Sequence, residues 1–201
     1  VNGNSNSQAF CETDIASPKE AYATSKYEAE LELQDLTRSS EMELVIIRPP
    51  LVYGPQAPGN FASLLKWMNK GIPLPLGAVH NKRSLIALDN LTSFIIHCIE
   101  HPKAANEIFL ISDGEDISTS QLLIRVSQAL GKKAFLLPIP TGVMTFFAKL
   151  IGKADMANRL FSSLQVDSSK AREFLDWESV ITMDQQLKKT AEAYLQNEKN
   201  L

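Results

Sequence analysis

A short apolar run that ends in two prolines is the most informative part of the chain for its architecture: Leu44-Val45-Ile46-Ile47-Arg48-Pro49-Pro50. The run does not alternate between apolar and polar residues, which is typical of a strand buried on both faces. Such strands belong to parallel sheets covered by helices. Because proline cannot continue a central strand, we expect the strand to end here and a loop to follow from Tyr53 to Gly59.

Helical and extended segments alternate along the rest of the chain. Two further buried strands are predicted at Ser84–Leu88 and Glu107–Ile111, and residues 136–139 are expected to be extended. Helices are expected over the ranges 18–37, 61–69, 89–101, 118–131, 143–151, 167–175 and 182–197. This alternation predicts an α/β protein with a parallel sheet.

Several helix starts carry a capping signal. Ser17 with Glu20, and Ser118 with Gln121, have the spacing of a capping box, in which two side chains bond the backbone at the helix start. Gly131 is expected to terminate the second of these helices. Single N-cap residues are expected to open three other helices, at Asp89, Asp167 and Thr182.

Composition narrows the function class before any motif is considered. The chain has 201 residues, 44% of them apolar, with a net charge of −3. The apolar content argues against disorder, and the negative charge argues against a protein that binds nucleic acid through phosphate contacts. Cys98 is expected to be a small core residue rather than a metal ligand. No stretch approaches the ~20 apolar residues of a membrane span. We expect a cytoplasmic protein, and a chain that is a piece of a longer one.

Tyr22 and Lys26 form the first candidate for chemistry. Four positions apart in the predicted helix 18–37, their side chains lie on one face. A neighbouring ammonium favours the ionised form of a phenol, and a phenolate can act as a general base toward a hydroxyl group. Ordinary amphipathic helices also show this spacing, so both a catalytic pair and a structural helix face remain open.

The second candidate is the segment that follows the first strand. Ligands in open parallel sheets bind beyond the carboxyl ends of strands, so the segment from Arg48 to Pro55 is well placed for one. The alternative is a stiff turn in which Arg48 pairs with a carboxylate. Arg83 could bind a phosphate through its planar guanidinium, and the helix that begins near Asn60 could offer backbone N–H groups to an anion.

The motifs along the chain occur in the order of a known family. They are Glu12-Thr13-Asp14, Tyr22-Ala23-Thr24-Ser25-Lys26, Arg48-Pro49-Pro50-Leu51-Val52-Tyr53-Gly54-Pro55, Gly59-Asn60-Phe61, Leu74-Pro75-Leu76-Gly77, Arg83-Ser84-Leu85-Ile86-Ala87-Leu88-Asp89-Asn90, Ser112-Asp113-Gly114, Val166-Asp167-Ser168-Ser169-Lys170-Ala171 and Leu175-Asp176-Trp177. In this order they resemble the C-terminal part of the extended short-chain dehydrogenases/reductases, and within them the NAD-dependent epimerase/dehydratase family and its UDP-glucose 4-epimerase-like branch. Asp89-Asn90 departs from the two acids common there, which is expected to affect helix capping more than chemistry.

The resemblance implies a two-part fold: the C-terminal part of a Rossmann-type parallel sheet and a small substrate-binding α/β subdomain. Residues 1–56 would be the remainder of the dinucleotide-binding domain. Residues 57–201 would mainly form the nucleotide-sugar-binding subdomain, with about 90–112 returning to the sheet. The glycine-rich motif that cradles a dinucleotide phosphate does not occur in this sequence.

The resemblance also assigns roles to single residues. Tyr22 and Lys26 match the family's catalytic pair, which also contacts NAD, and the expected catalytic Ser or Thr would lie upstream of Val1. Pro49 and Tyr53 resemble residues near the nicotinamide and the sugar. Four further positions resemble substrate contacts, Arg159 on the loosest match: Asn60, Leu74, Arg83 and Arg159. No metal is implied.

The implied activity is NAD-dependent epimerisation at C4 of a UDP-sugar, with this stretch of 201 residues inactive alone. Two alternatives stay open: a nucleotide-sugar 4,6-dehydratase or 4-keto reductase of the same family, and a non-catalytic module that binds a UDP-sugar or a protein. By the same resemblance, the helix with Tyr22 and Lys26 would form a homodimer interface. The apolar segment 143–153, flanked by lysines, could lie on a membrane surface, although packing against neighbouring helices is the expectation.

Overall fold

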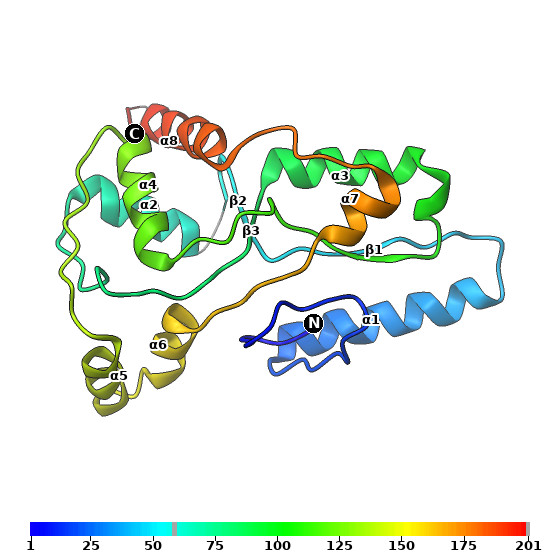
Figure 1. Cartoon of the computed structure of the whole chain (residues 1–201), viewed down its shortest axis with the longest axis horizontal. Helices are drawn as coiled ribbons and strands as arrows, with labels where there is room; N and C mark the ends of the chain where they lie inside the picture. Colours follow the sequence, from blue (N-terminus) through cyan, green and yellow to red (C-terminus); the bar gives the residue numbers. More distant parts are fainter. Residues whose placement is uncertain (58–59, 200–201) are drawn as a thin grey trace.

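The computed structural model describes residues 1–57 and 60–199, without the side chains of Asn60, Asp155, Met156, Arg159 and Lys199. The molecule is elongated, and Figure 1 shows helices grouped at one end and a pair of strands between helices at the other. The helices are α1 (Ala21–Arg38), α2 (Asn60–Lys70), α3 (Leu88–Glu100), α4 (Thr119–Ala129), α5 (Thr141–Leu150), α6 (Ala154–Phe161), α7 (Ser169–Leu175) and α8 (Met183–Lys199), with a 3-10 turn at Pro102–Ala104. The strands are β1 (Ile46–Arg48), β2 (Leu51–Tyr53), β3 (Leu85–Ala87) and β4 (Ile108–Leu110).

The strands form two short parallel pairs, which confirms the α/β prediction. Strand β1 pairs with β4, with Ile47 opposite Phe109. Strand β2 pairs with β3, with Val52 opposite Ile86. The parallel pairing was expected because the apolar runs do not alternate, and such strands need helices on both faces.

Strand β2 was not among the predicted strands, and its last residue, Tyr53, is the first residue of the predicted loop. Pro49 and Pro50 do end β1, but the chain resumes at Leu51 as a second strand that pairs with a different partner. The prolines therefore move the chain from one pair of strands to another. Because each strand has only three residues, periodicity alone could not separate β2 from a loop.

Strand β3 divides the core into two hydrophobic clusters, because successive side chains point to opposite faces of a strand. Leu85 and Ala87 belong to the first cluster, which also takes in residues of β2, α2, α4 and α8. Ile86 belongs to the second cluster, built from α3, β4 and α7. Cys98 lies in the second cluster and is 7% exposed, as expected of a small core residue.

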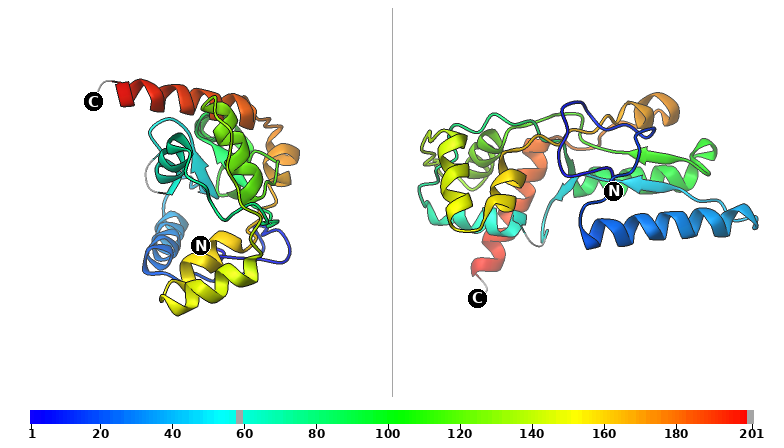
Figure 2. Two further views of the ribbon diagram at one scale, coloured as in Figure 1. Left: turned by 90° about the vertical axis from the view of Figure 1, so that its left-hand side faces the viewer. Right: turned by 90° about the horizontal axis from the view of Figure 1, so that it is seen from below.

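Helix α1 lies apart from both clusters. The views in Figures 1 and 2 place it beside β1, on the side away from α3. None of its residues is buried. The contacts that hold it are polar, above all between Arg48 on β1 and Glu30 on α1.

Helix starts were predicted with mixed success. The predicted capping box at Ser118 is formed, and a positive φ of 70° at Gly131 ends α4 as expected. The predicted cap at Thr182 is also present, with Gln185 returning the bond to the Thr182 backbone. The capping box at Ser17 is not formed, and α1 begins later, after Glu20. Asp89 was also wrong as an N-cap, because α3 begins at Leu88 and the Asp89 carboxylate pairs with Lys189 instead.

Two other helices differ from expectation. Helix α6 was not predicted at all, and its eight residues lie next to α5 in Figure 1. Helix α5 was predicted near its observed place. It packs against α6, and Met144 contacts the first cluster, although none of its residues is buried. Among the described residues, no helix is long and apolar enough to span a membrane.

Candidate functional site

Helix α1 presents Tyr22 and Lys26 on one face. The Lys26 Nζ atom lies 5.7 Å from the centroid of the Tyr22 ring. Tyr22 is 74% exposed, so its phenol is open to a ligand or to another part of the protein. The predicted pairing is therefore present in the structure, and its role as a catalytic pair stays a prediction.

The N-terminal segment ties the Tyr22 end of α1 to the rest of the molecule. The Asn4 side-chain amide donates to Glu20 Oε1 at 2.8 Å, immediately before the helix begins. The Ser17 backbone N–H donates to the Val1 carbonyl at 3.1 Å. These bonds explain why the capping box at Ser17 does not form, since Glu20 is engaged by Asn4. They also bring residues 1–4 close to the start of α1.

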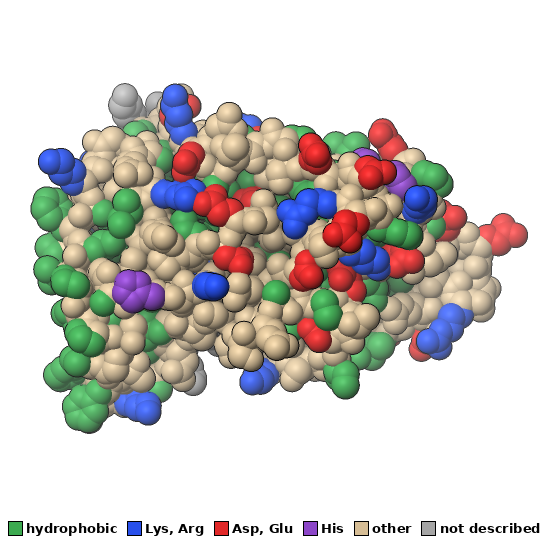
Figure 3. Space-filling model, in the orientation of Figure 1, with side chains coloured by type: hydrophobic (Ala, Val, Ile, Leu, Met, Phe, Trp, Pro, Cys, Tyr) green, Lys and Arg blue, Asp and Glu red, His purple; other side chains and the backbone are tan. Residues whose placement is uncertain are grey.

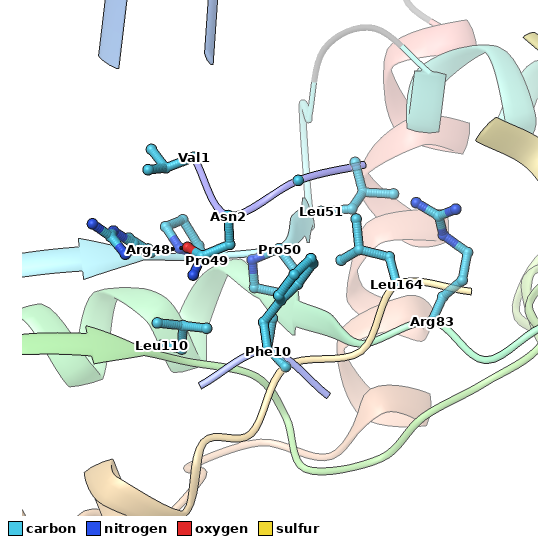
Figure 4. Close-up of a pocket in the computed structure, with 12 residues that line it drawn as sticks. Val1, Asn2, Phe10, Arg48, Pro49, Pro50, Leu51, Arg83, Leu110 and Leu164 are labelled. Atoms are coloured by element: carbon cyan, nitrogen blue, oxygen red, sulfur yellow. Dashed lines mark hydrogen bonds between the residues drawn. The ribbon is translucent and has the colours of Figure 1, made fainter. Parts of the chain in front are cut away.

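The same N-terminal segment lines a cavity of about 220 Å³ at the carboxyl end of β1. Figure 4 shows Arg48 and Arg83 at opposite ends of the lining, with Pro49, Pro50 and Leu51 between them. The lining residues are Val1, Asn2, Gly3, Phe10, Arg48, Pro49, Pro50, Leu51, Arg83, Leu110, Leu164 and Val166. Its position beyond a parallel strand is where open sheets bind ligands.

Arg48 has the carboxylate partner that one of the two sequence interpretations required. Its guanidinium bonds both oxygens of Glu30, with the shortest distance 2.6 Å, and also donates to Asn2 Oδ1 at 3.2 Å. Both side chains of the ion pair are nearly buried, at 11% and 14% exposure. Arg48 therefore fixes α1 against β1 and holds Asn2 at the cavity.

Arg83 comes from the segment before β3 and reaches the other end of the cavity. Its backbone bridges to Ile117 and Leu164, which fixes the position of its Cα. The side chain is half-buried, its Nη1 lies 3.4 Å from the Ser162 carbonyl, and burial lowers the pKa of the guanidinium. An arginine so placed remains a planar donor for a phosphate, as the sequence interpretation suggested.

Tyr53 has surroundings unlike those of a ligand contact. It is fully buried in the first cluster, and its hydroxyl donates to Asp113 Oδ2 at 2.7 Å. Burial, reinforced by the charge of Asp113, raises the pKa of Tyr53. Asp113 also accepts from the Ala87 backbone and from Asn90, so it joins β2, β3 and α3. In this structure Tyr53 is a core residue, and its predicted contact with a cofactor stays a prediction.

Asn90 shows why the residue pair at 89–90 matters to the fold. Its side-chain amide donates to Asp113 and to the Ile181 carbonyl, and its oxygen accepts the Val180 and Ile181 backbone N–H groups. The expected effect on helix capping was wrong. Asn90 instead connects α3 to the segment that precedes α8.

One further predicted substrate contact, Leu74, does not line the cavity. Leu74 pairs by backbone hydrogen bonds with the segment around Leu136 and packs on the first cluster, away from the cavity lining. The side chains of Asn60 and Arg159 lie outside the described residues. The structure thus brings Pro49 and Arg83 together at one cavity, whereas Tyr22 and Lys26 lie on α1 beside it.

Residues at the cavity that sequence reasoning missed come from the two ends of the chain. Phe10 bridges to Val166, and its ring would meet a Cβ at position 3 at 3.1 Å. Gly3 also has a φ of 146°, so a side chain there would be strained as well as crowded. The motif at Val166 was recognised, but only the fold shows that it closes the cavity. Among the described residues, no cluster of His, Cys, Asp and Glu could hold a metal ion.

This arrangement offers an exposed phenol with a neighbouring ammonium, and a partly polar cavity with an arginine at either end. The first pair could hold and deprotonate a hydroxyl group. The cavity could take the anionic part of a ligand, because arginine binds phosphate in a planar, bidentate way. Of the two arginines, Arg48 is held by Glu30, and Arg83 bonds the Ser162 carbonyl.

The sequence is similar to those of known proteins. The model of the NAD dependent epimerase/dehydratase family matches residues 2–112. The chain is 47% identical over 188 residues to a UDP-glucose 4-epimerase from Vibrio cholerae, covering 93% of this chain and 57% of that protein. It is 31% identical over 145 residues to the N-acetyl-alpha-D-glucosaminyl-diphospho-ditrans,octacis-undecaprenol 4-epimerase of Escherichia coli O157:H7, covering 68% and 44%.

The fold is shared with solved structures at lower identity. One is a UDP-glucuronic acid 4-epimerase from Bacillus cereus in complex with UDP-glucuronic acid and NAD, with a TM-score of 0.74 and 21% identity. The match covers 98% of this chain and 59% of that one. The chain thus spans less than two thirds of the length of the relatives it matches.

Proposed function

Because the chain belongs to the NAD dependent epimerase/dehydratase family, we propose that the complete protein inverts the configuration at C4 of a UDP-sugar. The substrate would be UDP-glucose or UDP-galactose, or their N-acetyl forms. The Tyr22–Lys26 pair carries this proposal: it is exposed on α1, with the ammonium 5.7 Å from the ring centroid. The 47% identity to a UDP-glucose 4-epimerase supports epimerisation over the other reactions of the family.

Part of an NAD site fits the residues present. Tyr22 and Lys26 offer a hydroxyl and an ammonium side by side and open to solvent, which suits the ribose next to a nicotinamide. Pro49 lies at the cavity nearby and would face the nicotinamide. The diphosphate would need a glycine-rich turn that this sequence does not contain. When bound, NAD would take up and return a hydride at the sugar C4.

In this proposal the side chains of this chain move the proton and hold the substrate. Tyr22, as phenolate, would take the proton of the 4-hydroxyl group and later return it. Lys26 would hold the ribose, with its ammonium beside the phenol. Arg83 would donate to the diphosphate of the UDP part, together with Asn60, Leu74 and Arg159 as further substrate contacts.

Two parts of the structure would bind the dinucleotide and the nucleotide sugar separately. Residues 1–56 would complete the dinucleotide-binding domain, and residues 57–201 would mainly bind the nucleotide sugar, with about 90–112 returning to the sheet. The two hydrophobic clusters on either side of β3 support such a division. Helix α7 packs with the second cluster, so residues 169–175 would also belong to the sheet side.

The decisive experiment replaces Tyr22 by Phe in the complete gene product. We expect conversion of UDP-glucose to UDP-galactose to fall at least ~1000-fold, because the general base is lost, while the melting temperature stays unchanged. Tyr27→Phe on the same helix is the matched control and should keep its activity. Equal activity in Tyr22→Phe and the wild type would refute the proposal.

Product analysis in the same assay separates the alternatives. A 4,6-dehydratase would release a product lighter by one water molecule, and a 4-keto reductase would consume a reduced cofactor. A non-catalytic module would bind UDP-glucose without converting it. The 201 residues alone are expected to show no turnover, because the glycine-rich turn is missing; measurable epimerisation by this chain would contradict that expectation.

The exposed face of α5 favours a second substrate class, a sugar linked through diphosphate to a lipid. The Escherichia coli O157:H7 relative is named for such a substrate. A direct comparison of UDP-N-acetylglucosamine with undecaprenyl-diphosphate-linked N-acetylglucosamine would decide between them. Turnover of the UDP-sugar alone would exclude the lipid-linked substrate.

Helix α1 would also pair with its copy in a homodimer. It exposes the large apolar side chains of Leu31, Leu33 and Leu36, and none of its residues is buried. Exposed apolar side chains grouped in this way are typical of an interaction surface. Sedimentation velocity of the complete protein checks this, and a monomer at working concentration would exclude it.

A further inference from the structure

Helix α5 carries its apolar side chains on the solvent side. Val143, Phe146, Phe147, Leu150 and Ile151 follow one another at helical spacing and are between 46% and 68% exposed. We call these five residues the α5 apolar face. Thr141, Met144, Thr145 and Ala148 are less exposed and form the other side of the helix. This orientation is the reverse of an ordinary surface helix, whose apolar stripe faces the core.

The exposed apolar surface continues beyond the helix. Phe135 and Leu137, on the extended segment that leads to α5, are 59% and 50% exposed, while Leu136 between them pairs with Leu74. Figure 3 shows apolar side chains gathered along the left edge of the molecule and at its lower left corner, where α5 lies in Figure 1. An exposed apolar surface of this extent is typical of an interaction site.

Between residues 132 and 153, all charged residues of the sequence are lysines. No Asp or Glu occurs between residues 132 and 153, whereas Lys132, Lys133, Lys149 and Lys153 do. Lys149 and Lys153 are exposed at the C-terminal end of the α5 apolar face, and Lys133 is exposed before it. Figure 3 shows a basic side chain beside the apolar corner. The rest of the chain is acidic, because the whole carries a net charge of −3.

Aromatic and aliphatic side chains on one face of a helix, with lysines at its edge, are the features of a helix that lies in a membrane interface. The apolar side chains enter the boundary between headgroups and acyl chains, and the lysines face anionic headgroups. We propose that α5 and the segment that precedes it dock this protein on an anionic lipid surface. A protein partner would need acidic groups to match the lysines.

The test is co-sedimentation of the chain with vesicles. Vesicles of phosphatidylcholine with phosphatidylglycerol should bind the chain, and vesicles of phosphatidylcholine alone should bind it much more weakly. Binding should fall as salt is added, because the headgroup attraction is screened. Phe146→Ser with Phe147→Ser should reduce binding at least ~10-fold, because two large apolar side chains no longer enter the lipid. Lys149→Gln with Lys153→Gln should reduce it roughly 30-fold, from about 1 kcal/mol per lysine.

A matched control comes from α3. Ile96 and Ile99 are 52% and 79% exposed, but no lysine flanks them on that helix. Ile96→Ser with Ile99→Ser should leave vesicle binding unchanged. Because all of these side chains are exposed, the variants should fold, and their melting temperatures check this.

Three results would overturn the proposal. The first is no binding to anionic vesicles, or binding that the α5 variants leave unchanged. The second is a dimer in sedimentation velocity that the α5 variants disperse without any vesicle binding, which would make a second copy the occupant. The third is binding by this chain but not by the complete gene product, which would mean that another part of the protein covers α5. None of these results bears on epimerisation, so this proposal and the proposed function fail separately.

Discussion

Helices α1 and α4 carry the same kind of sequence signal at their starts, but they differ in capping and in burial. Ser118 and Gln121 form a complete capping box, and six of the eleven residues of α4 are buried. Ser17 and Glu20 have the same spacing, yet α1 begins after Glu20 and buries none of its residues. The helix that carries the proposed chemistry thus buries none of its residues, whereas α4 is part of the core.

The difference shows when a local signal decides a helix start. At α4 the Ser118 backbone N–H donates to the Gln121 side chain at 2.9 Å. Glu20 accepts a hydrogen bond from Asn4, and the Ser17 backbone donates to Val1. These contacts belong to the segment that lines the cavity. At α1, therefore, tertiary contacts near the site replace the local cap, whereas α4 keeps it.

The largest expected effect is a difference in the free energy of unfolding between a variant of α4 and a variant of α1. Leu123 on α4 is 1% exposed in the first cluster, so Leu123→Ala should lower the free energy of unfolding by roughly 2–5 kcal/mol through a cavity. Leu36 on α1 is 60% exposed, so Leu36→Ala should change it by no more than about 0.5 kcal/mol. Urea denaturation measures both. Similar losses in the two variants would mean that α1 is packed in solution.

A smaller effect should test the two capping boxes directly. Ser118→Ala removes the acceptor of the Gln121 backbone N–H and should cost about 1 kcal/mol. Ser17→Ala should cost almost nothing, since the Ser17 side chain caps no helix. Thermal unfolding of the pair gives the difference. A cost at Ser17 equal to that at Ser118 would show that the capping box forms in solution after all.

The smallest effect concerns pH at a third helix start. At α7 the Ser169 backbone N–H donates to Asp167 Oδ1 at 2.9 Å, and this hydrogen bond lowers the pKa of Asp167. A lowered folded pKa means that the carboxylate stabilises the fold at neutral pH and that this contribution is lost as the pH falls through that pKa. Asp167→Ala should therefore be less stable than the wild type at pH 7, with the gap closing toward acid. A gap independent of pH would contradict it.

Much of the architecture could be predicted because apolar runs and capping residues act locally. Strands β1, β3 and β4, and the starts of α4 and α8, all follow from residues within a few positions. Strand β2 could not be predicted, since three residues after two prolines carry no period and their partner is Leu85–Ala87, more than thirty residues away. Helix α6 lacked any start signal of its own.

The candidate site divides in the same way. Tyr22 and Lys26 could be placed on one helix face because a spacing of four settles it. The sequence allows two roles for Arg48, a ligand contact or an ion pair with a carboxylate. Only the fold distinguishes these roles, because the partner Glu30 lies on another element. Tyr53 was expected near a cofactor but is buried on Asp113, which no sequence pattern connects to it.

By itself, then, the sequence determined the α/β class, the pairing of Tyr22 with Lys26 and the family, because each depends on residue type and spacing along the chain. Only the tertiary structure decided that Arg48 binds Glu30, that Phe10 and Val166 close a cavity with Arg83, and that α5 turns its apolar face outward. The physical reason is that burial and pairing across the fold depend on which distant segments meet. A local sequence pattern indicates how apolar one face of a helix is, but not which other segment that face packs against.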